Sequence, residues 1–126
     1  VVHVTNPAET DIDIYLGIGG AAEGVLAAAA LACIGGQMEG RLVALNKEHR
    51  AWAKLAGISD LTKTYTLKDM VSGDLSFAAT GITDGSMMAG VHHGPTTIAT
   101  ESVVMRASTH TRRWIRTEHA DPKKFD

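Results

Sequence analysis

The chain has 126 residues, a formal net charge of −2 and 44% hydrophobic residues, which predicts one globular domain with an ordinary core. Its near-neutral charge argues against a nucleic-acid binder, because such proteins usually carry a basic face. A single cysteine, Cys33, excludes an internal disulfide framework, and we expect a buried, inert thiol there.

Membrane and targeting signals are weak. The apolar stretch Val25–Ile34 is closed by glycines and falls short of the roughly 18 residues of a membrane span. Val1–Val4 is followed at once by polar residues, so we expect no signal peptide. The chain lacks an initiator methionine, which indicates either processing or a piece of a longer protein. We expect a cytoplasmic protein with no membrane partner.

The first predicted elements form a strand–helix–strand unit. Asp11–Ile18, "DIDIYLGI", alternates and then becomes apolar, which is typical of a strand entering a buried sheet. A glycine turn follows, then a helix over about Ala22–Cys33 that ends at Gly35 and Gly36,. Arg41–Leu45 predicts a second strand. Such an order favours a parallel, right-handed βαβ unit.

The second half of the chain predicts one more helix and several strands. Lys47–Ala56 is expected to be a helix that ends at Gly57, with Ala51, Trp52 and Leu55 as its apolar stripe,. The next expected elements are a short strand in "KTYTL", a helical turn at Leu67–Val71, a buried strand at Asp74–Thr80 and an antiparallel hairpin of Thr100–Arg106 with Thr111–Thr117,. The tail from Asp121 is expected to be loose.

The glycine turn before the first helix has the geometry of an anion site. A strand that runs through glycines into a helix presents free backbone N–H groups and the positive end of the helix dipole, which favour phosphate. Gly17, Gly19 and Ala22 formally satisfy the dinucleotide fingerprint G-x-G-x-x-A,. The acid required at the end of the second strand is missing, however, because "RLVAL" runs into Asn46.

Glu23 is the one carboxylate in this turn, and three interpretations of it stay open. It can be an ordinary first-turn acid that the dipole stabilises by a few tenths of a kcal/mol. It can be a catalytic base. It can also ligate Mg²⁺ or Mn²⁺ beside a phosphate, since these cations prefer carboxylate oxygen.

Other polar residues suggest weaker sites. His92 and His93 are adjacent, so on a strand they point to opposite faces, and no Cys/His spacing supports zinc. Arg112, Trp114 and Arg116 share one strand face, which suggests a solvated or inter-subunit strand before a nucleic-acid surface. Further isolated candidates are His110 in a predicted turn, His119 near the tail, and Ser86 and Ser102, which lack the hydrolase elbow,.

The stretch "DIYLGIGGAAEGVLAAAALACIGGQMEGRL" resembles the class II fructose-1,6-bisphosphatases, the GlpX type of bacteria. "LSFAATGITDG", "TTIATESVVMR" and "TRRWIRTEH" agree with that family in the same order. The resemblance covers residues 1–126 as the C-terminal portion only, because family members are more than twice this length. It implies that the missing N-terminal portion carries most of the metal ligands and the phosphate-binding cations.

The resemblance implies two site residues. Glu23 matches a family glutamate that ligates the active-site Mn²⁺ or Mg²⁺, and Gly20 matches a backbone contact to the sugar bisphosphate. Ala22 stands where the family usually has proline, which would fix the first helical turn. No Lys or Arg adjoins the glycine turn, and Arg41 is the nearest candidate.

The implied reaction is metal-dependent hydrolysis of the 1-phosphate of fructose 1,6-bisphosphate, and some relatives also accept sedoheptulose 1,7-bisphosphate. The implied fold is α/β, a layered sugar-phosphatase type with a mixed sheet, flanking helices and a C-terminal antiparallel hairpin. The implied partners are the N-terminal part of the same protein and further copies of it. A non-catalytic phosphate- or nucleotide-binding α/β module is the alternative.

Overall fold

A computed structural model describes residues 10–120 of the chain. Its helices are α2 (Ala21–Ile34), α3 (Lys47–Leu55) and α4 (Leu67–Met70), and its strands are β1 (Glu39–Arg41), β2 (Thr64–Thr66), β3 (Ser76–Thr80), β4 (His92–His93), β5 (Ile98–Arg106) and β6 (Thr111–His119). The predicted α/β class is thereby confirmed. The layered sugar-phosphatase arrangement stays a prediction.

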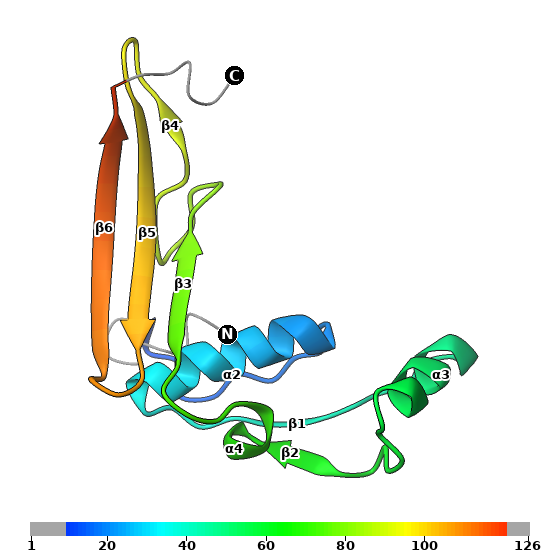
Figure 1. The fold of residues 1–126 in the computed structure, drawn as a ribbon. Coiled ribbons are helices and arrows are strands. Elements are labelled where there is room, and N and C mark those ends of the chain that lie inside the picture. Colours follow the sequence, from blue (N-terminus) through cyan, green and yellow to red (C-terminus); the bar gives the residue numbers. More distant parts are fainter. Residues whose placement is uncertain (1–9, 121–126) are drawn as a thin grey trace.

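The main sheet is built around β5. Strand β6 pairs along one side of β5, and β3 and β4 pair along the other, all antiparallel. The β5–β6 register runs without interruption from Ile98 opposite His119 to Arg106 opposite Thr111. The predicted C-terminal hairpin is confirmed and is longer than expected. Figure 1 shows these strands standing together, with β6 on the outside.

Helix α2 lies across one end of this sheet (Figure 1) and contributes half of the core. Ala30 and Cys33 of α2 pack against Val103 and Met105 of β5, and all four side chains are buried. The predicted burial of Cys33 is confirmed, and the inertness of its thiol stays a prediction. Gly35 ends the helix in the left-handed conformation, with φ of 77°, which glycine adopts without a steric cost.

The strand predicted at Asp74–Thr80 is formed as β3, but the prediction that it is buried was wrong, because only one of its faces is covered. Phe77 and Ala79 are half-buried and contact the core, while the alternate residues Ser76, Ala78 and Thr80 are exposed. An antiparallel sheet with a helix on one face leaves the other face to solvent.

The predicted parallel βαβ unit is not formed. Residues 11–20 have no regular secondary structure, and the second strand lies at Glu39–Arg41, earlier than the predicted Arg41–Leu45. Strand β1 pairs antiparallel with β2, with Gly40 opposite Tyr65. A strand needs a neighbour to bond its backbone groups, and within residues 10–120 the segment 11–18 has none. Ile14, Leu16 and Ile18 are therefore exposed.

The structure confirms the helix predicted at Lys47–Ala56, the short strand in "KTYTL" and the helical turn at Leu67–Val71, as α3, β2 and α4. Asn46 caps α3 by accepting a hydrogen bond from the backbone of His49 at 2.8 Å, and Thr66 and Asp69 form a capping box on α4,. The apolar stripe of α3 is largely exposed, at 59% for Trp52 and 85% for Leu55, and the ring of Trp52 stacks on His49 of the same helix.

Two predictions concern residues outside those described, namely the loose tail from Asp121 and the absence of a signal peptide at Val1–Val4. Among residues 10–120, no helix has the length and apolarity that a bilayer span requires.

Candidate functional site

Gly20 and the first turn of α2 form the predicted anion site. Gly20 is the N-cap residue, in extended conformation with φ of −66° and ψ of 151°, and it provides no capping side chain. The first N–H groups of an α-helix have no partner within the helix. The carbonyl of Gly20 accepts from Gly24 N at 3.0 Å, so α2 begins regularly. An anion can bind these N–H groups at the positive end of the dipole.

The structure brings Gly20 and Glu23 together. Oε2 of Glu23 occupies the space that a Cβ on Gly20 would fill. The carboxylate therefore folds back over the N-cap, and both residues are exposed. Ala22 lies in the same turn, within the helix. This local arrangement follows from the spacing of three residues along one helical turn.

The turn can offer two kinds of contact to a phosphorylated ligand held with a divalent cation. The backbone N–H groups suit phosphate oxygens, and the Glu23 carboxylate is a suitable ligand for Mg²⁺ or Mn²⁺. One carboxylate does not complete a cation site, and residues 10–120 contain no cluster of three or more His, Cys, Asp or Glu that could hold a metal ion. Within residues 10–120, Glu23 by itself does not form a complete cation site.

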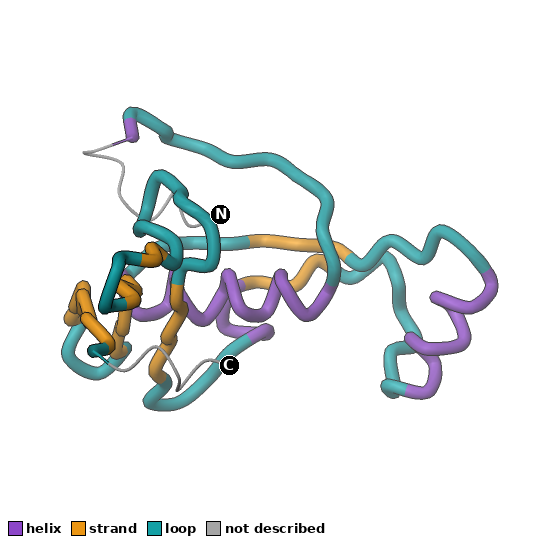
Figure 2. The backbone as a smooth tube through the Cα atoms, turned by 90° about the horizontal axis from the view of Figure 1, so that it is seen from above, coloured by secondary structure: helices purple, strands orange, loops and turns teal. Residues whose placement is uncertain are grey.

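The candidate turn lies at the end of α2 that is farther from the sheet. The buried residues of α2 all lie between Ala27 and Cys33, beyond its first six residues. Figure 2 shows the loop of residues 11–20 crossing at a distance from α2 before it descends to this far end. A helix of 14 residues is about 21 Å long, so the turn is well separated from the hydrophobic core.

A hollow in the described residues lies elsewhere. It has a volume of about 610 Å³ and is lined by residues from the C-terminal half of α2, the segment 68–75 and the β5–β6 turn, including Lys68, Asp74 and His110. It is open and shallow, and it lies at the opposite end of α2 from Glu23. Because the anion-binding groups lie at the other end, we place the candidate site at the turn.

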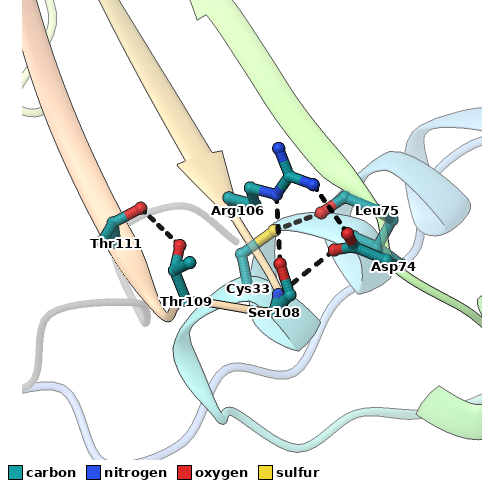
Figure 3. Close-up of polar contacts among 7 residues, drawn as sticks. All are labelled: Cys33, Asp74, Leu75, Arg106, Ser108, Thr109 and Thr111. Atoms are coloured by element: carbon teal, nitrogen blue, oxygen red, sulfur yellow. Dashed lines mark hydrogen bonds and ion pairs between the residues drawn. The ribbon is translucent and has the colours of Figure 1, made fainter.

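The polar network beside this hollow joins β3 to the hairpin turn. Asp74 accepts from Nη2 of Arg106 at 2.8 Å and from the backbone of Ser108 at 3.3 Å (Figure 3). The hydrogen bonds from Arg106 and Ser108 lower the pKa of Asp74. Burial raises the pKa of the nearby Cys33 thiol. Every member of this network contacts another part of the fold, which indicates a structural role.

A second carboxylate that sequence reasoning left without a role organises the loop after β3. Oδ1 of Asp84 accepts from Gly90 N at 2.8 Å and contacts Nε2 of His92 at 2.7 Å, and these bonds lower its pKa. The carboxylate of Glu101, in β5, accepts from the backbone of Ala89. The one aspartate between the two closely spaced glycines of "TGITDG" was the available signal for such a loop.

The other polar candidates are dispersed. His92 and His93 form β4, His110 contacts the carbonyl of Cys33 at 3.2 Å, and Ser102 bonds Thr80 at 2.8 Å. Arg41 lies opposite Thr64 in the β1–β2 pair. None of these contacts joins the turn at Gly20.

Comparisons with known proteins agree with the motifs. The model of the family described as bacterial fructose-1,6-bisphosphatase, glpX-encoded, matches residues 1–119. Two proteins named D-fructose 1,6-bisphosphatase class 2/sedoheptulose 1,7-bisphosphatase are similar. The one from Synechococcus sp. (strain JA-3-3Ab) is 37% identical over 87% of this chain and 35% of its own length. The one from Trichodesmium erythraeum (strain IMS101) is 34% identical over 89% and 36%.

These matches show that the chain belongs to a phosphatase family, the bacterial, glpX-encoded fructose-1,6-bisphosphatases. The chain spans about a third of the length of the curated relatives that it matches.

Proposed function

We propose that the protein to which this chain belongs hydrolyses the 1-phosphate of fructose 1,6-bisphosphate, releasing fructose 6-phosphate and inorganic phosphate, with Mn²⁺ or Mg²⁺ as cofactor. Family membership over residues 1–119 supports the reaction class. The names of the relatives make sedoheptulose 1,7-bisphosphate a second candidate substrate. The observation that carries the proposal is the Glu23 carboxylate folded over Gly20 at an open helix N-terminus.

Each group in the turn has a defined task in this proposal. The N–H groups at the start of α2 bind phosphate oxygens of the substrate. Gly20, with no side chain, lets the backbone approach the sugar phosphate. Glu23 provides one oxygen ligand to the cation. The cation, when bound, neutralises the charge that develops on the phosphoryl oxygens.

The other ligands are proposed to come from the part of the protein that corresponds to the remaining two thirds of the relatives. Mg²⁺ requires near-octahedral coordination, which Glu23 cannot complete within the described residues. We propose that the Lys and Arg side chains that bind the second phosphate also belong to that part of the protein. A cytoplasmic location, expected from the sequence, belongs to this proposal.

The test is phosphate release from fructose 1,6-bisphosphate by the protein expressed from its natural gene, with Mn²⁺, with Mg²⁺ and with a chelator. We expect turnover on the order of 1 s⁻¹ or more with metal and loss of turnover with chelator. The product shows which phosphate is removed: fructose 6-phosphate forms when the 1-phosphate is released, and fructose 1-phosphate forms when the 6-phosphate is released. Metal-independent binding of phosphate without turnover would instead favour the non-catalytic module.

A second experiment measures phosphate release by the 126-residue chain alone. We expect no metal-dependent phosphate release from them, and we expect activity to return when the N-terminal portion is included. Turnover on the order of 1 s⁻¹ from the 126 residues would mean that the metal ligands lie within them, and the assignment of Glu23 as one ligand among distant ones would be wrong.

A further inference from the structure

The carboxylate of Glu23 lies at the end of α2 where the unbonded N–H groups of the helix are also found. Gly20 is the N-cap and Glu23 is the third helical residue, so less than one full turn separates them. Oε2 of Glu23 fills the position that a Cβ on Gly20 would take, and only glycine leaves this space to the carboxylate. Because the contact lies within a single turn, it does not depend on any other part of the protein.

Among residues 10–120, the charge of this carboxylate is compensated by the helix rather than by a cationic side chain. No ion pair of the described residues includes Glu23, and Gly20 supplies no capping side chain. The positive end of a helix dipole attracts negative charge, and a carboxylate in the first turn is the nearest source of it. The dipole therefore favours the position of Glu23 over the N-cap.

A phosphate group would compete with the Glu23 carboxylate for this helix end. Both are anions, and both are stabilised by the same N–H groups and the same dipole. Two negative charges a few ångström apart repel each other, so a phosphate approaches unfavourably while the carboxylate lies over the N-cap with its charge uncompensated. Phosphate binding therefore requires that Glu23 moves or that its charge is neutralised.

We propose that Glu23 blocks phosphate at the N-terminus of α2 until its carboxylate binds a divalent cation, so that the cation binds before the sugar bisphosphate. This inference rests on the proposed function, in which Glu23 is one ligand of Mn²⁺ or Mg²⁺. The chemistry of the donor fits, because these cations prefer carboxylate oxygen. Once its charge is compensated by a cation, the carboxylate no longer repels phosphate, and the N–H groups become available.

The proposal predicts that the cation and phosphate each strengthen the binding of the other, since coupling between two ligands is reciprocal. A cation that simply bridged the protein and the phosphate would give the same coupling. The two explanations differ when no cation is present. Only a blocking role for Glu23 predicts that removal of its charge strengthens phosphate binding under that condition.

The test measures the binding of inorganic phosphate by calorimetry, using the protein expressed from its natural gene with a chelator present. Glu23→Gln keeps the shape of the side chain and removes its charge, and Glu23→Ala removes the carboxylate altogether. We expect both variants to bind phosphate at least about tenfold more tightly than the parent. Replacing the chelator with Mn²⁺ should strengthen phosphate binding by the parent much more than binding by either variant.

The matched control is Glu48→Gln, which makes the same change of charge in the first turn of α3. We expect its phosphate Kd to equal that of the parent, which would show that net charge alone does not produce the gain. Thermal denaturation of all three variants checks that each remains folded.

Unchanged or weaker phosphate binding by either Glu23 variant in the chelator would overturn the proposal. So would an equal gain in Glu48→Gln, or the absence of measurable phosphate binding by both Glu23 variants. These outcomes are separable from the proposed function. Turnover by the parent without the gain in the variants would retain the phosphatase and remove the blocking role, whereas the gain without turnover would retain the blocking role and remove the reaction.

Discussion

The carboxylate of Glu23 lies over the α-carbon of Gly20, in the space where a side chain on Gly20 would begin. The two residues belong to one helical turn, and the backbone of Gly20, with φ of −66°, is accessible to any amino acid. The absence of a side chain at this position is therefore not required by backbone strain. It leaves room for the Glu23 carboxylate.

Gly20→Ala should lower kcat/KM for fructose 1,6-bisphosphate about tenfold or more while the protein remains folded. The added methyl group would displace the Glu23 carboxylate and fill the space where the substrate is proposed to meet the backbone. Steady-state phosphate release measures the effect.

The matched control is Gly24→Ala, one turn further along α2, where an added Cβ meets nothing within 4 Å. Alanine is a better helix former than glycine, so this variant should be more stable by about 0.5–1 kcal/mol and retain activity. Equal losses of activity in both variants would remove the special role assigned to Gly20.

Glu23→Gln should abolish most turnover without unfolding the protein. The amide keeps the shape of the side chain but is a weaker ligand for Mg²⁺ or Mn²⁺. Activity should be measured against metal concentration, where we expect a higher metal requirement as well as a lower maximum. The control is Glu48→Gln, which changes another acidic residue in the first turn of an exposed helix. Turnover within about threefold of the parent at saturating metal would exclude Glu23 as a ligand.

Gly90→Ala should destabilise the protein by about 1–3 kcal/mol, as overpacking does. A Cβ at Gly90 would lie 2.6 Å from the carbonyl carbon of Thr83 and 2.7 Å from the carbonyl oxygen of Ile82, and backbone atoms cannot move aside easily. Gly85→Ala, in the same loop, meets only the carbonyl oxygen of Met88 at 3.8 Å. Its stability should change by less than about 0.5 kcal/mol. Chemical denaturation of both variants tests the packing of this loop.

The contribution of Asp74 to stability should depend on pH. Hydrogen bonds from Arg106 and Ser108 lower its pKa in the folded protein, so the folded state favours the charged carboxylate. The stabilisation is present above the ordinary pKa of aspartate, about 3.9, and is lost as the pH falls through the lowered folded value.

Asp74→Asn removes this titration. Denaturation curves should show the parent to be more stable than the variant at neutral pH, with the difference shrinking below about pH 4. A difference that is constant from pH 7 to pH 3 would mean that the charge of Asp74 does not contribute. The control is Asp60→Asn. The pKa of Asp60 is lowered chiefly by hydrogen bonds to Thr62, which is only two residues away.

The sequence by itself determined the elements whose signals lie within a few residues. Gly35 marks the end of α2, Asn46 begins α3, and the spacing of Thr66 and Asp69 caps α4. The approach of Glu23 to Gly20 belongs to the same class, because one helical turn places residues three apart on one side. These features require no knowledge of distant contacts.

Apart from the C-terminal hairpin and the burial of Cys33, only the tertiary structure decided which strands pair and which apolar residues are covered. The pattern of Asp11–Ile18 is that of a strand, yet within the described residues it has no neighbour and stays irregular. Strand β1 pairs antiparallel with β2, although α3 lies between them in the sequence. Asp84 contacts His92 because the loop between them folds back. Strand pairing and burial depend on which distant segments become neighbours, and periodicity along the chain carries no information about that choice.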